Sequence, residues 1–400
     1  MRALISTIEP VDGGVPSKLR WLVSELISLG IRPIIAWYAP WSRDPQLSVP
    51  SFALLSGRQP GQRRQDVWGL HQGHAIGCWL PELEFTHYLP GTHWQRLIRS
   101  ADLHLAVTGN PLCAHRFLQA RVPFLAWIGS DWEGDRRDRV NRFPLPRRLL
   151  DQAINAPMLR RMERHVLTAP QGRLLTISHA TAHRLERLGG RPPAGVLYRP
   201  PEPCFLPDSA CTAAWRLGFS GRYADPRKQL HLLLDAVHLL CQQGHPVQLE
   251  LTGEAHVPAS IRRAIQDRGL TNRVVCHPHL SLEDLAAVIR HWDLFVIPSA
   301  QEGLCIAALE AMACGVPVVS TRCGGPADFV IPNHTGSLVP HEAPAMAAAI
   351  ADICRSRQRR SRLSQGALHW IRSHADQHES QRRFRAHLLA TFPVLHDHSF

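Results

Sequence analysis

The 400-residue chain has no long hydrophobic run. No stretch approaches the roughly 18 consecutive apolar residues that a membrane-spanning helix requires, so no such helix is predicted. The first ten residues, MRALISTIEP, hold one Arg and a very short apolar run, which is typical of a first strand rather than a signal peptide. We therefore expect the chain to stay in the cytoplasm.

Closely spaced cysteine pairs are also absent. The 10 cysteines are scattered and form no C-x-x-C pair, which in a long cytoplasmic chain indicates mostly reduced thiols. His and Cys lie near each other in residues 71–78 and again in residues 276–279. With 24 histidines in the chain, chance proximity explains both groups better than metal binding does. We predict no metal site.

Lysine is almost missing. Of the 45 basic residues only Lys18 and Lys228 are lysines, and the formal net charge of +12 favours an anionic partner such as a nucleotide, a nucleic acid or a membrane surface. Lys228 stands out because a compact ammonium appears where this chain otherwise uses the planar guanidinium of Arg. The alternative is an exposed lysine without a function.

The chain is too long for one typical hydrophobic core, so two domains are expected. A Pro- and Gly-rich segment over residues 189–207 is typical of a linker between them. We therefore predict one domain over residues 1–200 and another over residues 201–365. Residues 41–100 have no pattern that assigns them to helices or strands.

Short apolar runs alternate with amphipathic stretches in both halves, which predicts parallel sheets flanked by helices. The first half has predicted strands at 3–6, 33–37, 103–107, 123–128 and 174–177 and a helix at 18–29. The second half has predicted strands at 216–219, 247–252, 273–276, 294–297 and 316–320, with helices at 229–242, 259–267, 281–291 and 304–313.

Ligands of doubly wound sheets bind beyond the carboxyl ends of the strands. The loops at 220–226, 252–256, 298–303 and 321–326 all follow predicted strands, so we expect them to face one crevice. The helix at 304–313 should end at Gly315, in the left-handed conformation that glycine favours.

Glu302 and Glu310 carry the strongest chemical signal. Eight residues of helix would separate them by about 12 Å, more than the roughly 5–9.5 Å between paired glycosidase carboxylates. This spacing suits a ligand that is held at two places, such as a nucleotide sugar, with Glu302 at the sugar and Glu310 at the ribose. The alternative is a solvent-facing carboxylate followed by a buried apolar helix. The amides that open the helix would point at an anion between the two carboxylates; they belong to Gly303, Leu304, Cys305 and Ile306.

The segment 293–340 strongly resembles the retaining family 4 glycosyltransferases of the GT-B fold. The family pattern runs from an apolar strand through Pro-Ser, Glu-Gly and a second Glu to a final Gly-Gly turn. The matching residues are Pro298-Ser299, Glu302-Gly303, Glu310, Ala311-Met312-Ala313, Gly315, Pro317-Val318-Val319, Gly324-Gly325 and Gly336.

Two further motifs resemble the same family. Gly221-Arg222 followed by Lys228 resembles its Gly-Arg…Lys-Gly segment, although Gln229 replaces the usual final Gly. The resemblance implies that Arg222 and Lys228 clamp the donor diphosphate, whose developing charge must be stabilised when it departs. A pair of surface cations near a helix start is the alternative.

The third motif is the Gly13-Gly14 loop after the first strand. Family members carry such a loop, which reaches the donor phosphates, and glycine permits this close an approach of the backbone. The resemblance implies that Gly14 contributes to the donor site.

One departure from the family lies after the predicted strand 123–128. Many members have a His there beside the transferred sugar, whereas this chain has Gly129, and the nearby His115 lies in a predicted helix. Asp131 and Asn110 are candidate contacts to the sugar or the acceptor, with an ordinary loop aspartate as the alternative for Asp131. The departure opens a second hypothesis, a protein that binds a nucleotide sugar without efficient transfer; the intact pair of glutamates argues against it.

Residues 136–164 hold nine Arg interleaved with apolar side chains. This composition suggests docking on anionic lipid, on the inner face of a membrane, which would suit a lipid-linked acceptor. A solvated Arg-rich helical surface is the alternative. Nucleic acid is not an expected partner, because no recognisable binding module accompanies the charge.

The resemblance thus implies an α/β protein of GT-B fold, with two facing Rossmann-like doubly wound domains and an interdomain cleft. It implies an acceptor-binding N-terminal domain, on which the helices from about 365–400 pack back, and a donor-binding C-terminal domain. The implied reaction is retaining transfer from a nucleotide-diphosphate sugar to a hydroxyl of a saccharide or lipid-linked acceptor, in bacterial polysaccharide or glycolipid assembly. No metal or other cofactor is required in this scheme.

The resemblance assigns the catalytic roles to Glu302, Arg222 and Lys228. The implied donor contacts are Gly14, Gly221, Gly303, Leu304, Cys305, Ile306 and Glu310. A sugar-nucleotide epimerase or a phosphorylase is disfavoured by the family-specific glutamate segment. A phosphorylase would also need a lysine for pyridoxal phosphate, and Lys228 is the only lysine in the C-terminal half.

Overall fold

The computed structural model describes residues 1–11, 13–69, 71–140, 143–207, 214–254 and 256–396. The chain forms two compact units. Unit 1 comprises Met1–Leu197 together with the segment from Gln381 onward, and unit 2 comprises Tyr198–Ser380. The first boundary lies close to the predicted residue 200, whereas the chain returns to unit 1 at residue 381 rather than at about 365.

Unit 1 is built on an eight-stranded sheet with the order β3-β4-β2-β1-β5-β6-β7-β8. Its strands are β1 (Arg2–Thr7), β2 (Arg32–Tyr38), β3 (Gln62–Val67), β4 (His71–Ile76), β5 (Leu103–Thr108), β6 (Phe124–Ile128), β7 (Gly172–Thr176) and β8 (Gly195–Val196). Its helices are α1 (Gly14–Ser28), α2 (Thr92–Ser100), α3 (His115–Gln119), α4 (Trp132–Val140), α5 (Leu145–Leu150), α6 (Ala156–Thr168), α7 (His179–Gly189) and α14 (Gln377–Thr391). Short turns of helix are η1 (Pro45–Leu47), η2 (Ser51–Ser56), η3 (Glu84–Tyr88), η4 (Pro111–Ala114), the π-helical η5 (Asp151–Asn155) and η8 (Pro393–Leu395).

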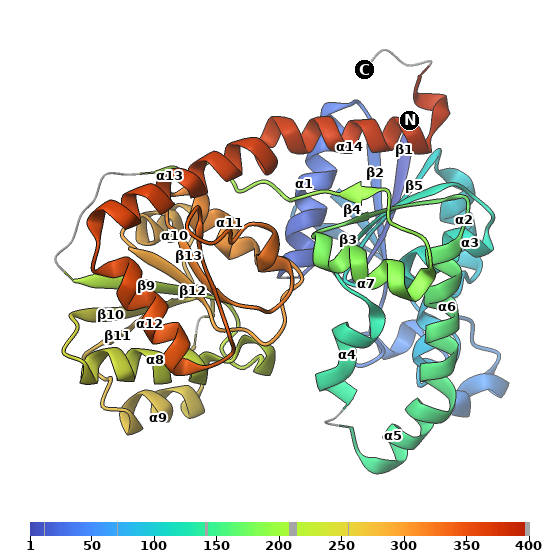
Figure 1. Cartoon of the computed structure of the whole chain (residues 1–400). Helices are drawn as coiled ribbons and strands as arrows, with labels where there is room; N and C mark the ends of the chain where they lie inside the picture. Colours follow the sequence, from blue (N-terminus) through green and yellow to red (C-terminus); the bar gives the residue numbers. More distant parts are fainter. Residues whose placement is uncertain (12, 70, 141–142, 208–213, 255, 397–400) are drawn as a thin grey trace. The chain divides into compact units, whose positions relative to one another are not determined.

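Side chains of one strand alternate between the two faces of this sheet. On β1, Ala3 and Ile5 belong to a core that α1 and α14 cover, while Leu4 belongs to the opposite core, under α2, α3, α6 and α7 (Figure 1). Phe384 of α14 lies in the first of these cores. The end of the chain is therefore part of the fold of unit 1.

The expectation of parallel sheets is wrong for one strand of unit 1. β3 pairs antiparallel with β4, whereas the other strand pairs of the sheet are parallel. Only residues 68–70 separate β3 from β4, and so short a connection can join only antiparallel neighbours. This hairpin lies in residues 41–100, to which the sequence pattern assigned no element.

Unit 2 is built on a six-stranded parallel sheet with the order β11-β10-β9-β12-β13-β14. Its strands are β9 (Trp215–Ser220), β10 (Val247–Thr252), β11 (Val274–Cys276), β12 (Leu294–Ile297), β13 (Val318–Thr321) and β14 (Gly336–Val339). Its helices are α8 (Leu230–Gln242), α9 (Ala259–Asp267), α10 (Leu282–Ile289), α11 (Ile306–Ala313), α12 (Ala343–Cys354) and α13 (Arg357–His374), with short turns η6 (Pro226–Lys228) and η7 (Gly325–Asp328).

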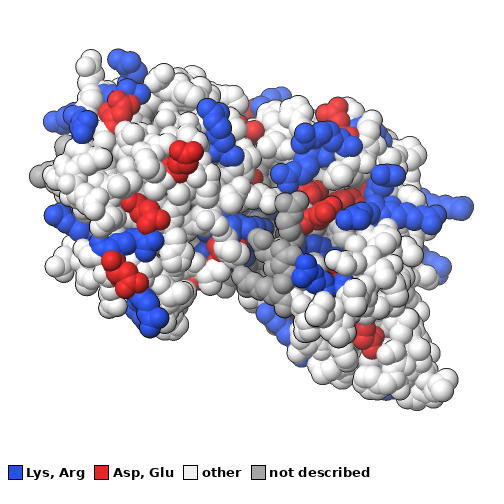
Figure 2. Space-filling view, turned by 60° about the horizontal axis from the view of Figure 1, so that its bottom comes forward, with Lys and Arg blue, Asp and Glu red and all other residues white. Residues whose placement is uncertain are grey.

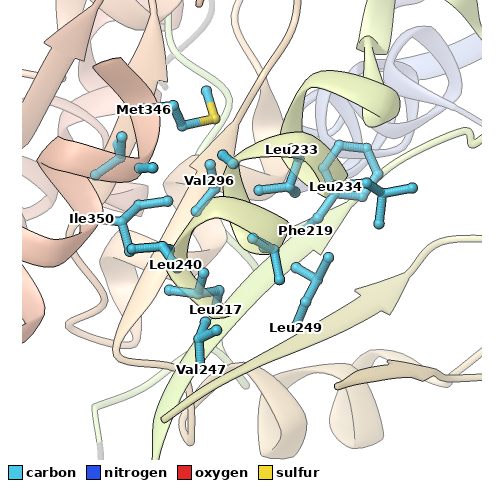
Figure 3. Packing of buried hydrophobic residues seen from close by; sticks show 14 of the residues in the cluster. Leu217, Phe219, Leu233, Leu234, Leu240, Val247, Leu249, Val296, Met346 and Ile350 are labelled. Atoms are coloured by element: carbon cyan, nitrogen blue, oxygen red, sulfur yellow. The ribbon is translucent and has the colours of Figure 1, made fainter. Parts of the chain in front are cut away.

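The core of unit 2 lies where α8 and α12 pack on the sheet. Leu217 and Phe219 of β9 meet Leu233 of α8 and Ile350 of α12 in this cluster (Figure 3). α10, α11 and α13 lie on the other side of the sheet in Figure 1. Because helices cover both faces, the four residues of β12, LFVI, are all buried and all apolar.

α13 explains why the chain leaves unit 2 later than expected. Leu363, Ala367 and Trp370 of this helix are buried, and Trp370 packs edge-on against Phe329 of the same unit. The predicted α/β fold with two Rossmann-like domains is confirmed, while an interdomain cleft stays a prediction. Within the part of the chain that the structure describes, none of the helices combines the length and the apolar composition of a membrane span.

Candidate functional site

The strand order of unit 2 reverses direction between β9 and β12. From β9 the chain proceeds outward through β10 to β11, and it then returns to β12 and proceeds the other way. Ligands of open α/β sheets bind at such a switch point, beyond the carboxyl ends of the two strands. The loop after β9 carries Arg222, and the loop after β12 carries Glu302. Two of the predicted catalytic residues therefore lie at the switch point.

Glu302 and Lys228 are in direct contact. The Lys228 ammonium donates to Oε1 of Glu302 over 2.7 Å, and the hydroxyl of Ser299 donates to the same oxygen over 2.7 Å. Burial by itself lowers the pKa of Lys228, but the charge of Glu302 and its hydrogen bond, together with the nearby Cys305 and Asp225, outweigh this, and the pKa is raised overall. The ammonium therefore keeps its proton at neutral pH.

The Gly-Gly turn holds the backbone of Glu302 in place. The Glu302 amide donates to Cys323 O over 2.8 Å, and the Gly325 amide donates to Glu302 O over 3.0 Å. A Cβ on Gly325 would stand 2.1 Å from Gly303 O, so only glycine allows the two loops to approach this closely. The loops after β12 and β13 therefore meet, as the sequence predicts.

The loops after β9 and β10 meet in the same way. The two strands pair over their full length, and the Gly221 amide donates to Thr252 O over 3.0 Å. Gly253 has φ +129°, and a Cβ there would lie 2.5 Å from Gly221 O. Glu254 then accepts a hydrogen bond from the Tyr223 amide over 3.0 Å. The loop after β10 thus holds the backbone of the loop after β9, which carries Gly221, in place.

Arg222 has a carboxylate partner in this structure. Its guanidinium lies 2.6 Å from Asp225, and the Arg222 side chain is 61% exposed. Burial raises the pKa of Asp225, but hydrogen bonds and charge from Arg227, together with the charge of Arg222, outweigh this and lower it to about 2. Arg222 therefore lies at the surface, bound to an ionised aspartate, whereas Lys228 is largely buried beside Glu302.

Glu310 is buried on α11. Burial raises the pKa of its carboxyl to about 7, although the positive charge of Arg199 opposes the shift. The Arg199 guanidinium lies 3.6 Å from Glu310 and also bonds Glu202. Sequence reasoning missed Arg199. A buried carboxyl among apolar residues signals a cationic partner, but no local pattern connects it to an arginine in the linker.

Helix α11 begins two residues later than predicted. Cys305 has φ +73°, a left-handed conformation that interrupts the helix, so Leu304 and Cys305 lie in the preceding turn. The helix start has no side-chain cap and no acidic residue in its first turn. The amides at such a start favour an anion. Burial, followed by the charge of Glu302, raises the pKa of the Cys305 thiol, which stays neutral.

In unit 1 the Gly13-Gly14 motif opens α1. Gly13 has φ +121°, and a Cβ built on it would meet nothing within 4 Å. Lys18 of the same helix is buried and donates to Thr108 O over 3.0 Å and to Trp127 O over 3.2 Å. This ammonium thus ties α1 to the carboxyl ends of β5 and β6, a role that the sequence did not indicate.

The two candidate sugar contacts in unit 1, Asp131 and Asn110, form hydrogen bonds with other groups of the protein. Oδ2 of Asp131 accepts from the Gly134 amide over 2.9 Å and Oδ1 lies 2.9 Å from Arg184, so both oxygens are engaged. The side-chain oxygen of Asn110 accepts from the Leu112 amide over 3.1 Å and caps η4.

Gly129, which stands where many family members have a histidine, and the nearby His115 both lie in closely packed surroundings. His115 is buried on α3, where burial lowers its pKa to about 4. Gly129 follows β6, and a Cβ there would lie 3.3 Å from Gly109 O. A side chain at position 129 would thus require the neighbouring loop to shift slightly.

The segment 136–164 is only partly the basic-apolar surface that its composition suggests. Arg136 is buried and pairs with Glu84 and Asp151 at 2.8 and 2.5 Å, and Leu159 is fully buried. The exposed apolar side chains are Leu145, Leu149, Leu150, Ile154 and Met158. Arg136 and Leu159 are therefore not available to a lipid surface.

Basic residues elsewhere are mixed with acidic ones. On the face that Figure 2 shows, Lys and Arg side chains lie among Asp and Glu side chains, and large areas carry neither. Among the described residues, no group of three or more His, Cys, Asp or Glu is placed to hold a metal ion.

Comparison with known sequences gives matches that centre on unit 2. A family model described as "Glycosyl transferases group 1" matches residues 214–370. A GDP-mannose-dependent alpha-(1-6)-phosphatidylinositol monomannoside mannosyltransferase of Mycolicibacterium smegmatis is 30% identical over 153 residues, which are 36% of this chain and 40% of that protein. A D-inositol 3-phosphate glycosyltransferase of Pseudarthrobacter chlorophenolicus is 36% identical over 129 residues, which are 31% of this chain and 30% of that protein. The chain thus covers less than half the length of each of these relatives.

Solved structures resemble the whole chain. The sucrose-phosphate synthase from Thermosynechococcus elongatus has a TM-score of 0.74 at 19% identity and covers 98% of this chain and 99% of that one. The Anabaena protein HepE in complex with UDP-glucose has a TM-score of 0.69 at 17% identity and covers 98% of this chain and 100% of that one. At these identities the likeness concerns the fold, and it agrees with the two Rossmann-like units of the GT-B architecture.

Proposed function

We propose that this protein is a glycosyltransferase that moves a sugar from a nucleotide-diphosphate sugar to a hydroxyl acceptor with retention of anomeric configuration. The observation that carries the proposal is the buried pair of Lys228 and Glu302 at the switch point of unit 2. The match of residues 214–370 to a glycosyltransferase family supports it.

In this proposal the chain supplies position and charge. Lys228 and Arg222 stabilise the departing diphosphate, with the amides at the start of α11 and the Gly14 loop as further donors. Glu302 orients the transferred sugar and Glu310 holds the ribose. Arg222 must exchange Asp225 for the diphosphate, which its exposure permits.

The family resemblance implies how the retaining step of this proposal proceeds. The acceptor hydroxyl approaches on the same face as the leaving group, a donor phosphate oxygen accepts its proton, and the bond from the sugar to the diphosphate breaks as the new glycosidic bond forms. The scheme uses no metal or other cofactor. Holding the reactants in place is the main contribution of the protein.

The acceptor belongs to polysaccharide or glycolipid assembly in this proposal, and the exposed face of α5 and η5 docks on anionic lipid. Leu145 and Leu149 are 74% and 61% exposed, and Arg147 and Arg148 lie between them. Replacing both leucines by serine should reduce sedimentation with vesicles that contain phosphatidylglycerol. Unchanged sedimentation would remove the membrane from the proposal.

Donor consumption tests the proposed activity. The purified chain is incubated with GDP-mannose, UDP-glucose or ADP-glucose and an acceptor panel of saccharides and D-inositol 3-phosphate, and nucleotide release is measured beside NMR of the product anomer. The proposal predicts acceptor-dependent release with one nucleotide and a retained configuration. Nucleotide binding without release of product would favour a binding protein, and an inverted product would refute the retaining step.

A further inference from the structure

Unit 1 contains a cavity of about 560 Å³ at the carboxyl ends of β1, β2 and β5. Thr7, Tyr38 and Asn110 line it at those three strand ends. The strand order of unit 1 reverses between β1 and β5, so this cavity lies at the switch point of the sheet. A volume of this size is typical of sites for small ligands.

Arg116 lines this cavity and is 1% exposed. Its guanidinium donates to Ser6 Oγ over 2.9 Å and to His87 O over 2.6 Å, and it lies 3.5 Å from the centre of the Trp94 ring. These partners are neutral, and the Nε atom has no hydrogen-bond partner among the described residues. No described carboxylate forms an ion pair with Arg116.

A buried charge without a counterion is costly, so it usually has a partner. Burial lowers the pKa of Arg116 to about 10, and the neighbours that oppose the shift are Cys113, Tyr88 and Cys78, none of them a carboxylic acid. The guanidinium nevertheless stays charged at neutral pH. None of the described carboxylates pairs with this guanidinium, so an anionic ligand of the cavity can supply that contact.

Four carboxylates also line the cavity, and each has a partner within the protein. Arg43 pairs with Glu9 at 2.6 Å, and Arg136, which does not line the cavity, pairs with both Glu84 and Asp151. Oε1 of Glu82 accepts hydrogen bonds from the Ser51 amide and hydroxyl, and its Oε2 has no hydrogen-bond partner among the described residues. Arg147 differs, because its guanidinium lies over the Phe143 ring at 4.6 Å at the exposed edge. Two cationic groups, one deep and one at the edge, thus face the same space.

The cavity also offers groups that suit a hydroxylated ligand. The side-chain oxygen of Asn155 is buried, lines the cavity and has no hydrogen-bond partner among the described residues. Tyr38 and His87 are stacked at 3.9 Å between ring centroids and also line it. Amide oxygens accept hydrogen bonds from hydroxyl groups, and guanidinium groups bind phosphate through several N–H donors.

We propose that this cavity binds the phosphate ester of a phosphorylated sugar or polyol, with Arg116 as the buried and Arg147 as the exposed contact of the phosphate. This inference rests on the proposed function and deepens it, since the phosphate ester is the acceptor and its hydroxyl receives the sugar. The phosphate belongs either to a soluble molecule or to a lipid headgroup, and both present the same group to the two arginines.

Calorimetric titration of the full chain tests the preference for phosphate. D-inositol 3-phosphate and glucose 6-phosphate are compared with inositol and glucose, and at least one phosphorylated probe should bind about tenfold or more tightly than its neutral parent. If neither soluble ester shows the preference, vesicles of phosphatidylcholine with phosphatidylinositol should bind more protein than vesicles of phosphatidylcholine alone. Equal binding in every pair would overturn the inference.

Arg147 and Arg148 form a matched pair of variants. Both are exposed on α5, but only Arg147 lines the cavity. Arg147→Gln should lower the affinity for the preferred phosphorylated probe about fivefold or more, and Arg148→Gln should change this affinity less than about twofold. Equal effects of the two substitutions would contradict a phosphate site in the cavity and indicate general charge attraction.

Arg116→Gln should abolish the preference for phosphate while circular dichroism and thermal melting show a folded protein. If this variant does not fold, the comparison of Arg147→Gln with Arg148→Gln still tests whether the cavity binds phosphate. Binding of the nucleotide to unit 2 is titrated in the same samples. An unsubstituted chain that binds the nucleotide and turns over the donor but shows no preference for phosphate esters would refute this inference alone, whereas a chain that prefers phosphate esters but consumes no donor would refute the proposed function.

Discussion

The ammonium nitrogen of Lys228 lies 2.7 Å from a carboxylate oxygen of Glu302, although 74 residues separate the two in the chain. Their side chains are only 17% and 10% exposed. A buried pair of this kind loses much of its hydration and is weak evidence for stability by itself. Its position at the switch point of the sheet, where ligands bind, gives it a functional interpretation.

Glu302→Gln should lower donor turnover by about a hundredfold or more, because an amide replaces the carboxylate that orients the sugar. Affinity for the free nucleoside diphosphate should change much less, since Lys228 keeps its charge. Turnover and titration of the same samples check this. Glu283→Gln, at an exposed position of α10, is the control; equal turnover of the two variants would exclude Glu302 from the reaction.

Glu310 should make the stability of the ligand-free protein depend on pH. Burial raises the pKa of its carboxyl from 4.5 to about 7. A raised carboxyl pKa means that stability is fully present below about pH 4.5 and is lost as the pH rises through about 7. The shift corresponds to at most about 3 kcal/mol.

Glu310→Gln removes this titration, because glutamine stays neutral. Relative to the parent, the variant should gain stability between about pH 5 and pH 8 in urea unfolding. Buried Glu163, whose pKa burial also raises to about 7, contributes a similar dependence in both proteins and cancels in the difference. A difference that does not vary with pH would mean that Glu310 is ionised throughout.

Gly253→Ala should destabilise unit 2 and displace the loop that carries Gly221. Gly253 has φ +129°, and the new Cβ would meet Gly221 O at 2.5 Å. Gly244→Ala is the matched control, since Gly244 also has a positive φ, +77°, but a Cβ there meets nothing within 4 Å.

Gly244→Ala should lower the free energy of unfolding by about 1 kcal/mol and Gly253→Ala by about 3 kcal/mol, because only Gly253→Ala adds a steric clash to the strained backbone conformation. Thermal unfolding of the two variants, with titration of nucleotide, measures both effects. Equal loss of stability would show that the close approach of the two loops is not needed.

The elements of unit 2 were largely predictable from the sequence. Strand β10 and helix α9 have the predicted bounds, because apolar residues recur there with the strand and helix periods and clear turn residues flank them. The loops that carry Arg222 and Glu302 follow from the alternation of strands and helices. The spacing of apolar residues was sufficient to predict an element wherever the element buries one of its faces.

Other features depend on contacts between distant residues. The left-handed turn at Cys305 breaks a pattern that reads as continuous helix, and it delays α11 to Ile306. Arg199 reaches Glu310 from the linker, and Arg116 meets His87 from another part of unit 1. Periodicity carries no information on such pairs, so the contacts of Arg199 and Arg116 were visible only in the structure.

Calorimetric titration with UDP, GDP and ADP, beside Lys228→Met and the exposed control Arg263→Met, tests the central claim most directly. A nucleoside diphosphate site in unit 2 predicts that one nucleotide binds the parent protein and the control, and that Lys228→Met weakens it about tenfold or more. If no nucleotide binds, or if both variants bind it as the parent does, the diphosphate site at Lys228 is contradicted.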